Sequence, residues 1–228
     1  MRFAKLLLLC VCISFTAKAE MKLAAPFFPP YAYFDIDGNL SGIWIKQLEP
    51  LLQEAEIEFK AINTPIKRFY SSIATGKVEL AALPKGMPGM ENVLLSEKPF
   101  AHFDLRVFWL FDKPEISTLA HLAGQRVVLI KGYSYGGYLQ QSLDEAQRGQ
   151  FVVVENQLEA IKLLLADKAD YVLGYWAMMD YLQKNFPDTQ LNNHKVSEIP
   201  IFLAIHNRTP NANAIMQRFE TAYGGMSK

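Results

Sequence analysis

The chain has 228 residues, half of them hydrophobic, which is enough to bury a substantial core. Its 23 basic and 23 acidic residues balance, and no basic stripe occurs, so nucleic acid is not an expected partner. After residue 19, no apolar run is long enough to span a bilayer.

Residues 1–19 have the composition of a secretory signal peptide. Arg2 and Lys5 precede an apolar run, and Ala17 and Ala19 place small residues at the two cleavage positions. The apolar run is shorter than the about 18 residues that a membrane anchor needs. We therefore expect cleavage after Ala19 and a periplasmic location. Cleavage would remove both cysteines, so no disulfide, thiol nucleophile or thiolate metal site is expected.

The first third of the mature chain alternates between strand and helix patterns. Ile45, Leu48 and Leu52 have the spacing of a helix that packs on a sheet. The predicted elements are strands at 22–28 and 31–34, a turn at 35–39, a helix at 42–55, a strand at 57–62, a helix at 66–75 and a strand at 78–83. This order favours a mixed or parallel sheet with helical crossovers.

The same alternation restarts after a loop at 84–90 and an apolar strand at 107–111. The elements predicted there are strands at 126–130, 151–154 and 170–174, each followed by a helix, at 137–148, 157–166 and 176–185. A last strand at 199–205 and a helix at 211–223 close the chain. Two α/β units joined by single strands predict two lobes. We place lobe 1 at 20–108, completed by 200–228, and lobe 2 at 109–199.

The turn after the strand at 126–130 carries the strongest functional signal. Gly132-Tyr133-Ser134-Tyr135-Gly136 separates this strand from a helix, so backbone N–H groups and the Ser134 hydroxyl are aimed at whatever lies above the turn. The turn also satisfies the pattern G-x-S-x-G, which a hydrolase uses to present a nucleophilic serine. The sequence therefore allows either a ligand cradle or a nucleophile elbow.

The order of segments resembles the family-3 bacterial extracellular solute-binding proteins, which are periplasmic and serve polar amino-acid transporters. The resemblance covers roughly 28–220 and rests on PPYAYFDIDGNLSGIWIKQLEPLL, SIATGKVELAA, LLSEKPF, LAHLAGQRVVLIKGYS and LEAIKLLLADKADYVLG. It implies an α/β, two-lobed periplasmic-binding-protein fold of type II. In that fold each lobe is a mixed sheet flanked by helices, hinge strands join the lobes, and a ligand lies between them.

Ligands of α/β lobes lie beyond the carboxyl ends of strands, where helices begin. The candidate ligand-binding residues chosen by this rule are Phe28, Tyr31, Leu83, Lys85, Gly132, Tyr133, Ser134, Tyr135, Tyr175 and Trp176. The resemblance implies an aromatic platform for the ligand at or near Phe28 and places the family's helix-N-terminus loop at residues 132–135. Arg68 resembles an arginine that short orphan members of the family carry near the cleft.

Two ionic contacts of the amino-acid binders of this family have no counterpart here. Their loop arginine would fall at residues 85–92, where no arginine occurs, and their carboxylate would fall near Tyr175. A free amino acid would lose two desolvated charge contacts, each worth on the order of 2–5 kcal/mol. We therefore expect a small polar or aromatic-polar ligand, with Arg68 or Lys85 balancing the charge if the ligand is an acid.

Three alternatives stay open at this stage. A serine hydrolase would use Ser134, with Asp170 or Asp180 and His194 or His206 following in the usual order, but no HGGG-like oxyanion segment precedes it. A catalytic family member would resemble cyclohexadienyl dehydratase. A ligandless module would only engage a receptor. We expect a monomer without catalysis, cofactor or metal, whose partner is an ABC permease or a membrane sensor kinase.

Overall fold

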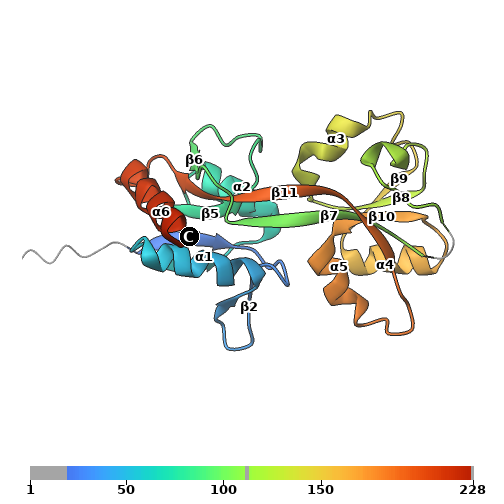
Figure 1. The fold of residues 1–228 in the computed structure, drawn as a ribbon, viewed down its shortest axis with the longest axis horizontal. Coiled ribbons are helices and arrows are strands. Elements are labelled where there is room, and N and C mark those ends of the chain that lie inside the picture. The colour runs from blue at the N-terminus through green and yellow to red at the C-terminus, as the bar shows by residue number, and fades with distance from the viewer. Residues whose placement is uncertain (1–19, 111–112, 227–228) are drawn as a thin grey trace, which may run out of the picture.

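The computed structural model describes residues 20–110 and 113–226 of the protein. The expected signal peptide lies outside these residues. Two lobes lie side by side, and two long neighbouring strands run between them (Figure 1). The fold is thus α/β and two-lobed, as the sequence predicts.

Lobe 1 contains a mixed sheet built around β1 (Met21–Ala25). β1 pairs in parallel with β4 (Phe59–Asn63) and β5 (Leu80–Leu83), and β6 (Val93–Leu95) pairs with the end of β11. The helices are α1 (Ile43–Glu54), α2 (Ile66–Ala74) and α6 (Ala212–Met226), and β2 (Tyr33–Phe34) and β3 (Leu40–Ser41) form a separate hairpin. Both the first strand and the last helix therefore belong to lobe 1.

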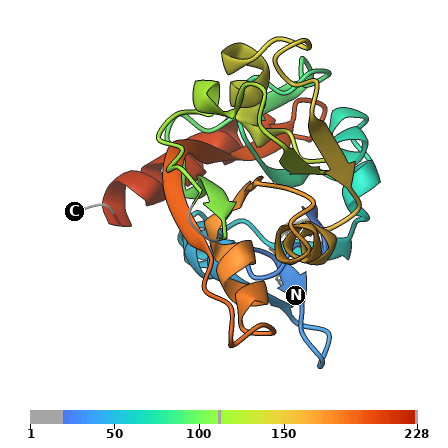
Figure 2. The ribbon, with the colours of Figure 1, turned by 90° about the vertical axis from the view of Figure 1, so that its right-hand side faces the viewer.

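Lobe 2 repeats this design with β8 (Val127–Ile130), β9 (Phe151–Val154) and β10 (Tyr171–Tyr175). β8 pairs in parallel with both neighbours because helical crossovers connect the three strands. The helices are α3 (Tyr138–Ser142), α4 (Gln157–Leu165) and α5 (Trp176–Gln183), and 3-10 turns occur at η1 (Leu119–Leu122) and η2 (Tyr135–Gly137). Viewed from the end of this lobe, α3 lies on one side of the strands and α4 and α5 lie on the other (Figure 2).

The two strands that cross between the lobes are β7 (Ala101–Trp109) and β11 (Asn192–His206). They pair antiparallel with each other; β7 also pairs with β10 of lobe 2, and the end of β11 pairs with β5 of lobe 1. The described strands therefore follow the order β4-β1-β5-β11-β7-β10-β8-β9. We call these two connecting strands the hinge strands.

Three elements differ most in length from the sequence predictions. β7 and β11 begin earlier than predicted. The additional residues of β7 alternate between buried and more exposed positions, and those of β11 are exposed or partly exposed, so neither stretch forms the apolar run that marks a strand in the sequence. The helix predicted at 137–148 ends at Ser142. Beyond it, the backbone N–H groups of Asp144 and Gln147 each donate to the other residue's side chain, which closes a turn instead of another helical turn.

The largest hydrophobic cluster is continuous across both lobes. It contains Leu23 and Leu48 of lobe 1, Val127 and Leu139 of lobe 2, and Leu105 of β7 between them. No helix of the described residues is long and apolar enough to cross a membrane.

Candidate functional site

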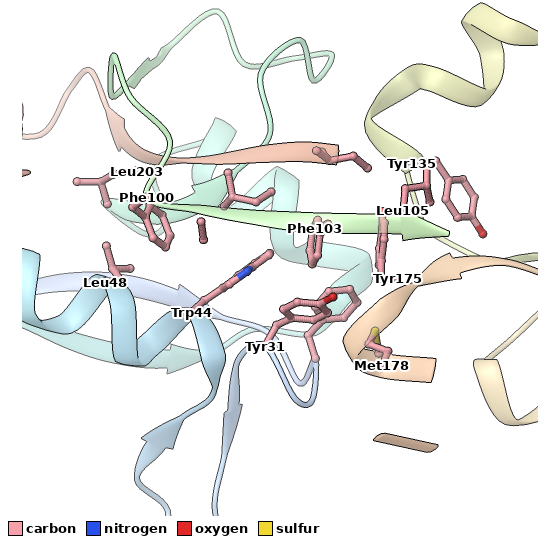
Figure 3. Close-up of a cluster of buried hydrophobic side chains, with 14 of the residues drawn as sticks. Tyr31, Trp44, Leu48, Phe100, Phe103, Leu105, Tyr135, Tyr175, Met178 and Leu203 are labelled. Carbon is pink, nitrogen blue, oxygen red and sulfur yellow. The ribbon is translucent and has the colours of Figure 1, made fainter. Parts of the chain in front are cut away.

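Aromatic side chains gather where the two lobes meet. Phe28, Tyr31 and Trp44 come from lobe 1, Phe103 comes from β7, and Tyr133, Tyr135 and Tyr175 come from lobe 2. The Phe103 and Tyr175 rings stack with their centroids 4.2 Å apart, and the Phe28 and Tyr133 rings meet edge to face at 5.5 Å. Figure 3 shows Tyr31, Trp44 and Phe103 directed toward Tyr175. The interface between the lobes is therefore built from aromatic contacts.

A small cavity of about 40 Å³ lies within this cluster. Seven aromatic side chains line it: Phe28, Trp44, Phe69, Tyr70, Phe103, Tyr133 and Tyr175. Gly132 and Ser134 close it on the side of lobe 2, and Pro84 closes it on the side of lobe 1. Among the described residues that line it, none carries a formal charge. The cavity can thus offer stacking surfaces and hydrogen bonds, and its walls contain no ionic group.

The turn after β8 has its shape because of Tyr135. This residue has a left-handed backbone, with φ of 49°, and its side chain is almost fully buried. Its hydroxyl accepts a hydrogen bond from the backbone N–H of Ile130 at 2.7 Å, so the turn is fastened to the end of β8. Gly136 follows with φ of 62°, and a Cβ there would lie 3.1 Å from the Ile199 and Tyr138 side chains. Buried contacts thus hold the backbone around Ser134 in place.

The Ser134 hydroxyl lies beside two tyrosines. Burial raises the pKa of Tyr70 and of Tyr175, and hydrogen bonding with Ser134 lowers each of them in part. Both phenols therefore stay neutral at physiological pH and keep their protons as hydrogen-bond donors. Because Tyr70 belongs to α2 and Ser134 to the turn after β8, this hydroxyl group lies where the two lobes meet.

The surroundings of Ser134 do not match those of a hydrolase nucleophile. No histidine is among the described residues that line the cavity. His206 is buried in lobe 1, where its Nδ1 accepts from the Arg208 backbone N–H, and His194 pairs with Glu115. A general base within hydrogen-bond reach is the geometric signature of an activated serine. The described part of the chain also has no cluster of three potential metal ligands.

Five of the predicted site residues meet at the cavity, namely Phe28, Gly132, Tyr133, Ser134 and Tyr175. Tyr31 and Tyr135 lie behind them in the aromatic cluster. The Tyr31 hydroxyl accepts a 3.3 Å hydrogen bond from the backbone N–H of Ala177, at the start of α5, and so also connects the lobes. These seven residues form one continuous group.

The other four predicted residues do not line the cavity. Leu83 is fully buried in the core of lobe 1, next to Phe69. Trp176 packs against Phe108 and carries the Arg106 guanidinium above its ring. The remaining two are exposed: Arg68 lies on α2, and Lys85 extends over the Phe202 ring.

Four aromatic lining residues were not predicted as site residues. They are Trp44 of α1, Phe69 and Tyr70 of α2, and Phe103 of β7. The start of α2 could have been found from sequence, because α2 begins soon after the carboxyl end of β4, where ligands of α/β lobes lie. Trp44 and Phe103 gave no such signal because the first lies on a helix and the second in the middle of a strand.

Comparison with family models and with curated proteins finds no match to this sequence. Among solved structures, a histidine kinase sensor domain with similarity to periplasmic binding proteins has a TM-score of 0.73 at 15% identity, over 91% of this chain and 90% of that one. The GluR0 ligand-binding core in complex with L-glutamate gives 0.71 at 14% identity, over 92% and 95% of the two chains. An ancestral arginine-binding protein bound to arginine gives 0.70 at 17% identity, over 91% and 92%.

At sequence identities this low, the similarity to these three structures establishes the fold alone. The chain has the two-lobed architecture of periplasmic binding proteins. The three similar structures named above comprise a binding protein, a ligand-binding core and a sensor domain.

Proposed function

We propose that this protein is an exported solute-binding protein that holds a small polar or aromatic-polar molecule between its lobes. The observation that carries the proposal is the cavity at the lobe interface, where aromatic rings from both lobes surround the Ser134 hydroxyl. Binding of a small molecule is also what the solved structures of similar fold suggest, since two of them hold L-glutamate and arginine. The bound protein would then deliver its ligand to an ABC permease or signal to a membrane sensor kinase.

Ligand capture in this proposal depends on lobe motion. A cavity of about 40 Å³ is far smaller than the roughly 300–1,000 Å³ of ordinary ligand sites, so the lobes must part to admit a ligand. The two hinge strands allow this movement because, among the described residues, the other contacts between the lobes are made by side chains, including the Tyr31 hydroxyl that accepts from the Ala177 N–H. We propose a monomer with lobe 1 at 20–108 and 200–228 and lobe 2 at 109–199.

We assign roles to the predicted residues from their positions relative to the cavity. Phe28 and Tyr133 would stack on the ligand, and Ser134 with the backbone of Gly132 would hydrogen-bond to it. Arg68 and Lys85 remain proposed partners for an acidic ligand, because each follows closely on a cavity residue, Ile66 and Pro84 respectively. Replacing either one with alanine without any change in ligand affinity would contradict that role.

A thermal-shift screen tests the proposal. The panel should contain amino acids, polyamines, dicarboxylates, aromatic acids and uncharged aromatic compounds. A true ligand at a hundred times its Kd adds about 2.7 kcal/mol of stability, which raises Tm by several degrees. Ser134→Val should reduce the shift, whereas Ser142→Val, at the exposed end of α3, should leave it unchanged. A panel without any shift, or equal effects of both variants, would contradict the proposal.

Catalysis is tested separately. The proposal includes no chemical step, so a fluorophosphonate probe should not label Ser134. Labelling that disappears in Ser134→Ala would instead indicate a serine hydrolase and would require a proton acceptor other than the described cavity residues.

A further inference from the structure

An apolar groove of about 400 Å³ lies next to the cavity on the outside of the lobe interface. Lobe 1 contributes Phe27, Phe28 and Ile66 to its walls, and lobe 2 contributes Tyr133, Leu158 and Tyr181. Phe28, Ile66 and Tyr133 line both the groove and the cavity, so these side chains form the wall between the two spaces. Since Phe28 and Tyr133 come from opposite lobes, parting the lobes would join the two spaces into one.

Several large apolar side chains that line the groove are exposed to solvent. Phe27 is 69% exposed, Tyr181 48%, Leu158 38% and Ile66 36%. Side chains of this size are exposed singly on most proteins, but an exposed group around one concave surface is typical of a binding site. The volume of the groove also falls within the roughly 300–1,000 Å³ of small-molecule sites.

The described side chains that line the cavity and the groove carry no net charge. The described residues of the groove include two charged side chains, Lys131 and Glu155, which form an ion pair with each other. The cavity walls contain no charged side chain among the described residues. A charged ligand held wholly within the two spaces would therefore find no unpaired counter-ion among the described lining residues, and a buried charge without a partner disfavours binding.

One of the residues that line the cavity, Trp44, has a hydrogen-bond donor without a partner among the described residues. Trp44 is 6% exposed, and its indole Nε1 is buried without a hydrogen-bond partner among the described residues. A buried N–H group that lacks a partner is costly, and indole N–H groups are usually paired when they are buried. A carbonyl or ring-nitrogen acceptor on a ligand would satisfy it.

We propose that the ligand is an uncharged, elongated aromatic molecule that occupies the cavity and the groove together. Its hydrogen-bond acceptor faces Trp44 Nε1, and its apolar part lies against Phe27, Leu158 and Tyr181. This inference rests on the proposed function and narrows the ligand to a neutral amphipathic class. The Phe28 and Tyr133 rings move apart to flank the molecule and stack on it from the two lobes.

The experiment uses prodan, an uncharged naphthalene with a ketone acceptor, and compares it with the anionic dye 8-anilinonaphthalene-1-sulfonate. Prodan should bind the purified protein saturably at one site, and its emission should shift on binding. The anionic dye should bind about tenfold more weakly or not at all, because the described lining residues offer its charge no unpaired counter-ion.

Two matched residues on α4 provide the control. Leu158, in the groove, and Leu165, at the other end of the helix and outside the groove, are 38% and 39% exposed. Leu158→Ser should weaken prodan binding about tenfold, and Leu165→Ser should leave it unchanged. Trp44→Phe, which keeps a ring and removes the N–H, should weaken binding about fivefold and remove the effect of hydrogen bonding on the emission.

Equal affinities of Leu158→Ser and Leu165→Ser for prodan, or tighter binding of the anionic dye, would overturn this inference. If the thermal-shift screen still found a ligand whose effect depended on Ser134, the proposed function would remain and only the neutral spanning ligand would be wrong. If no compound in either experiment bound, both would be wrong.

Discussion

Tyr135 shows how one residue shapes the candidate site without lining its cavity. Its left-handed backbone would be unfavourable for a tyrosine unless the surroundings fixed it. They do so because the ring is buried among Tyr133 and Tyr175 and the hydroxyl accepts the Ile130 N–H. The hydroxyl thus satisfies a backbone donor at the end of β8 and holds Ser134 at the lobe interface.

Removing that hydroxyl should be costly. Tyr135→Phe leaves the Ile130 N–H buried without an acceptor, which should lower the free energy of unfolding by about 1–3 kcal/mol. Urea denaturation measures this change. Tyr138→Phe is the control, since its hydroxyl makes only a 3.4 Å contact with the Glu198 carbonyl and should cost less than about 0.5 kcal/mol. Equal costs would show that the Ile130 contact has no special role.

At this scale, the predicted residues fall in loops that reach the cavity, but not every predicted side chain lines it. Leu83 and Trp176 were predicted and do not line the cavity, whereas Tyr175, which was also predicted, and Pro84, which was not, do line it. Successive side chains along a strand point to opposite faces, so a one-residue difference moves a side chain from the core to the cleft. Strand ends can be predicted from composition, whereas the face that meets the other lobe depends on the twist of the sheet.

At the scale of elements, the start of α4 is fixed by a reciprocal cap. The Asn156 side chain accepts from the Glu159 N–H at 3.0 Å, and the Glu159 carboxylate accepts from the Glu155 N–H at 3.1 Å. Asn156→Ala should therefore lower the free energy of unfolding by about 1 kcal/mol, whereas Asn156→Asp keeps an acceptor and should change it little. Chemical denaturation compares the two, and similar losses in both would exclude a capping effect.

Asp170 connects the elements at the far end of lobe 2. Its carboxylate accepts from Arg126, just before β8, and from Lys113, both at 2.7 Å. These hydrogen bonds, Arg126 first, hold the pKa of Asp170 well below its ordinary value of 3.8 although burial opposes the shift. A lowered pKa in the folded state contributes stability that is present above the unfolded pKa and is lost as the pH falls.

Asp170→Asn should therefore destabilise the protein at pH 7. The difference in the free energy of unfolding between this variant and the natural protein should shrink as the pH falls below about 4. In that range the carboxyl group of the unfolded chain takes up a proton, and the stability that the ionised Asp170 contributes is progressively lost. Urea midpoints measured from pH 7 to pH 3 test this. A difference that stayed constant over that range would mean that packing, and not the charge of Asp170, stabilises this end of the lobe.

Most element positions could be predicted, and the exceptions have a physical reason. The helices at 42–55 and 66–75 were predicted because buried apolar residues recur at helical spacing, as in α1 and α2. The first half of β11 is exposed and polar, so no hydrophobic pattern marked it. It forms a strand because β7 supplies hydrogen-bonding partners from a distant part of the chain, and local sequence does not record such pairing.

At the scale of the whole molecule, the lobes share a core. The largest hydrophobic cluster runs through both of them, and Tyr175 stacks on Phe103 and on Tyr133 at its centre. We therefore expect a single calorimetric unfolding transition. Tyr175→Ala should lower stability by about 3–5 kcal/mol and separate or broaden this transition, because it removes the ring that stacks on Phe103 and Tyr133 between the lobes.

Tyr181→Ala is the matched control, since this tyrosine is 48% exposed and should leave a single transition. Two transitions in the unsubstituted protein would contradict cooperative unfolding of the lobes and would give direct support for the lobe boundaries that we propose.

The two-lobed arrangement could be predicted from the order of segments, because the α/β alternation restarts after an isolated strand. The aromatic contact between the lobes could not, since it joins residues of five separate segments whose approach depends on how the hinge strands twist. The same aromatic residues line the cavity, and for this reason its described walls contain no charged side chain. This property, too, is visible only in the three-dimensional structure.

The first strand and the last helix both belong to lobe 1, with α6 packed against α1. Fluorescent labels attached at the two ends of the folded chain would consequently both lie on lobe 1, and energy transfer between them should not change with the lobe movement that we propose. A label near the end of α6 and another at Lys184, just after α5, would lie on different lobes, so energy transfer between them would measure that movement.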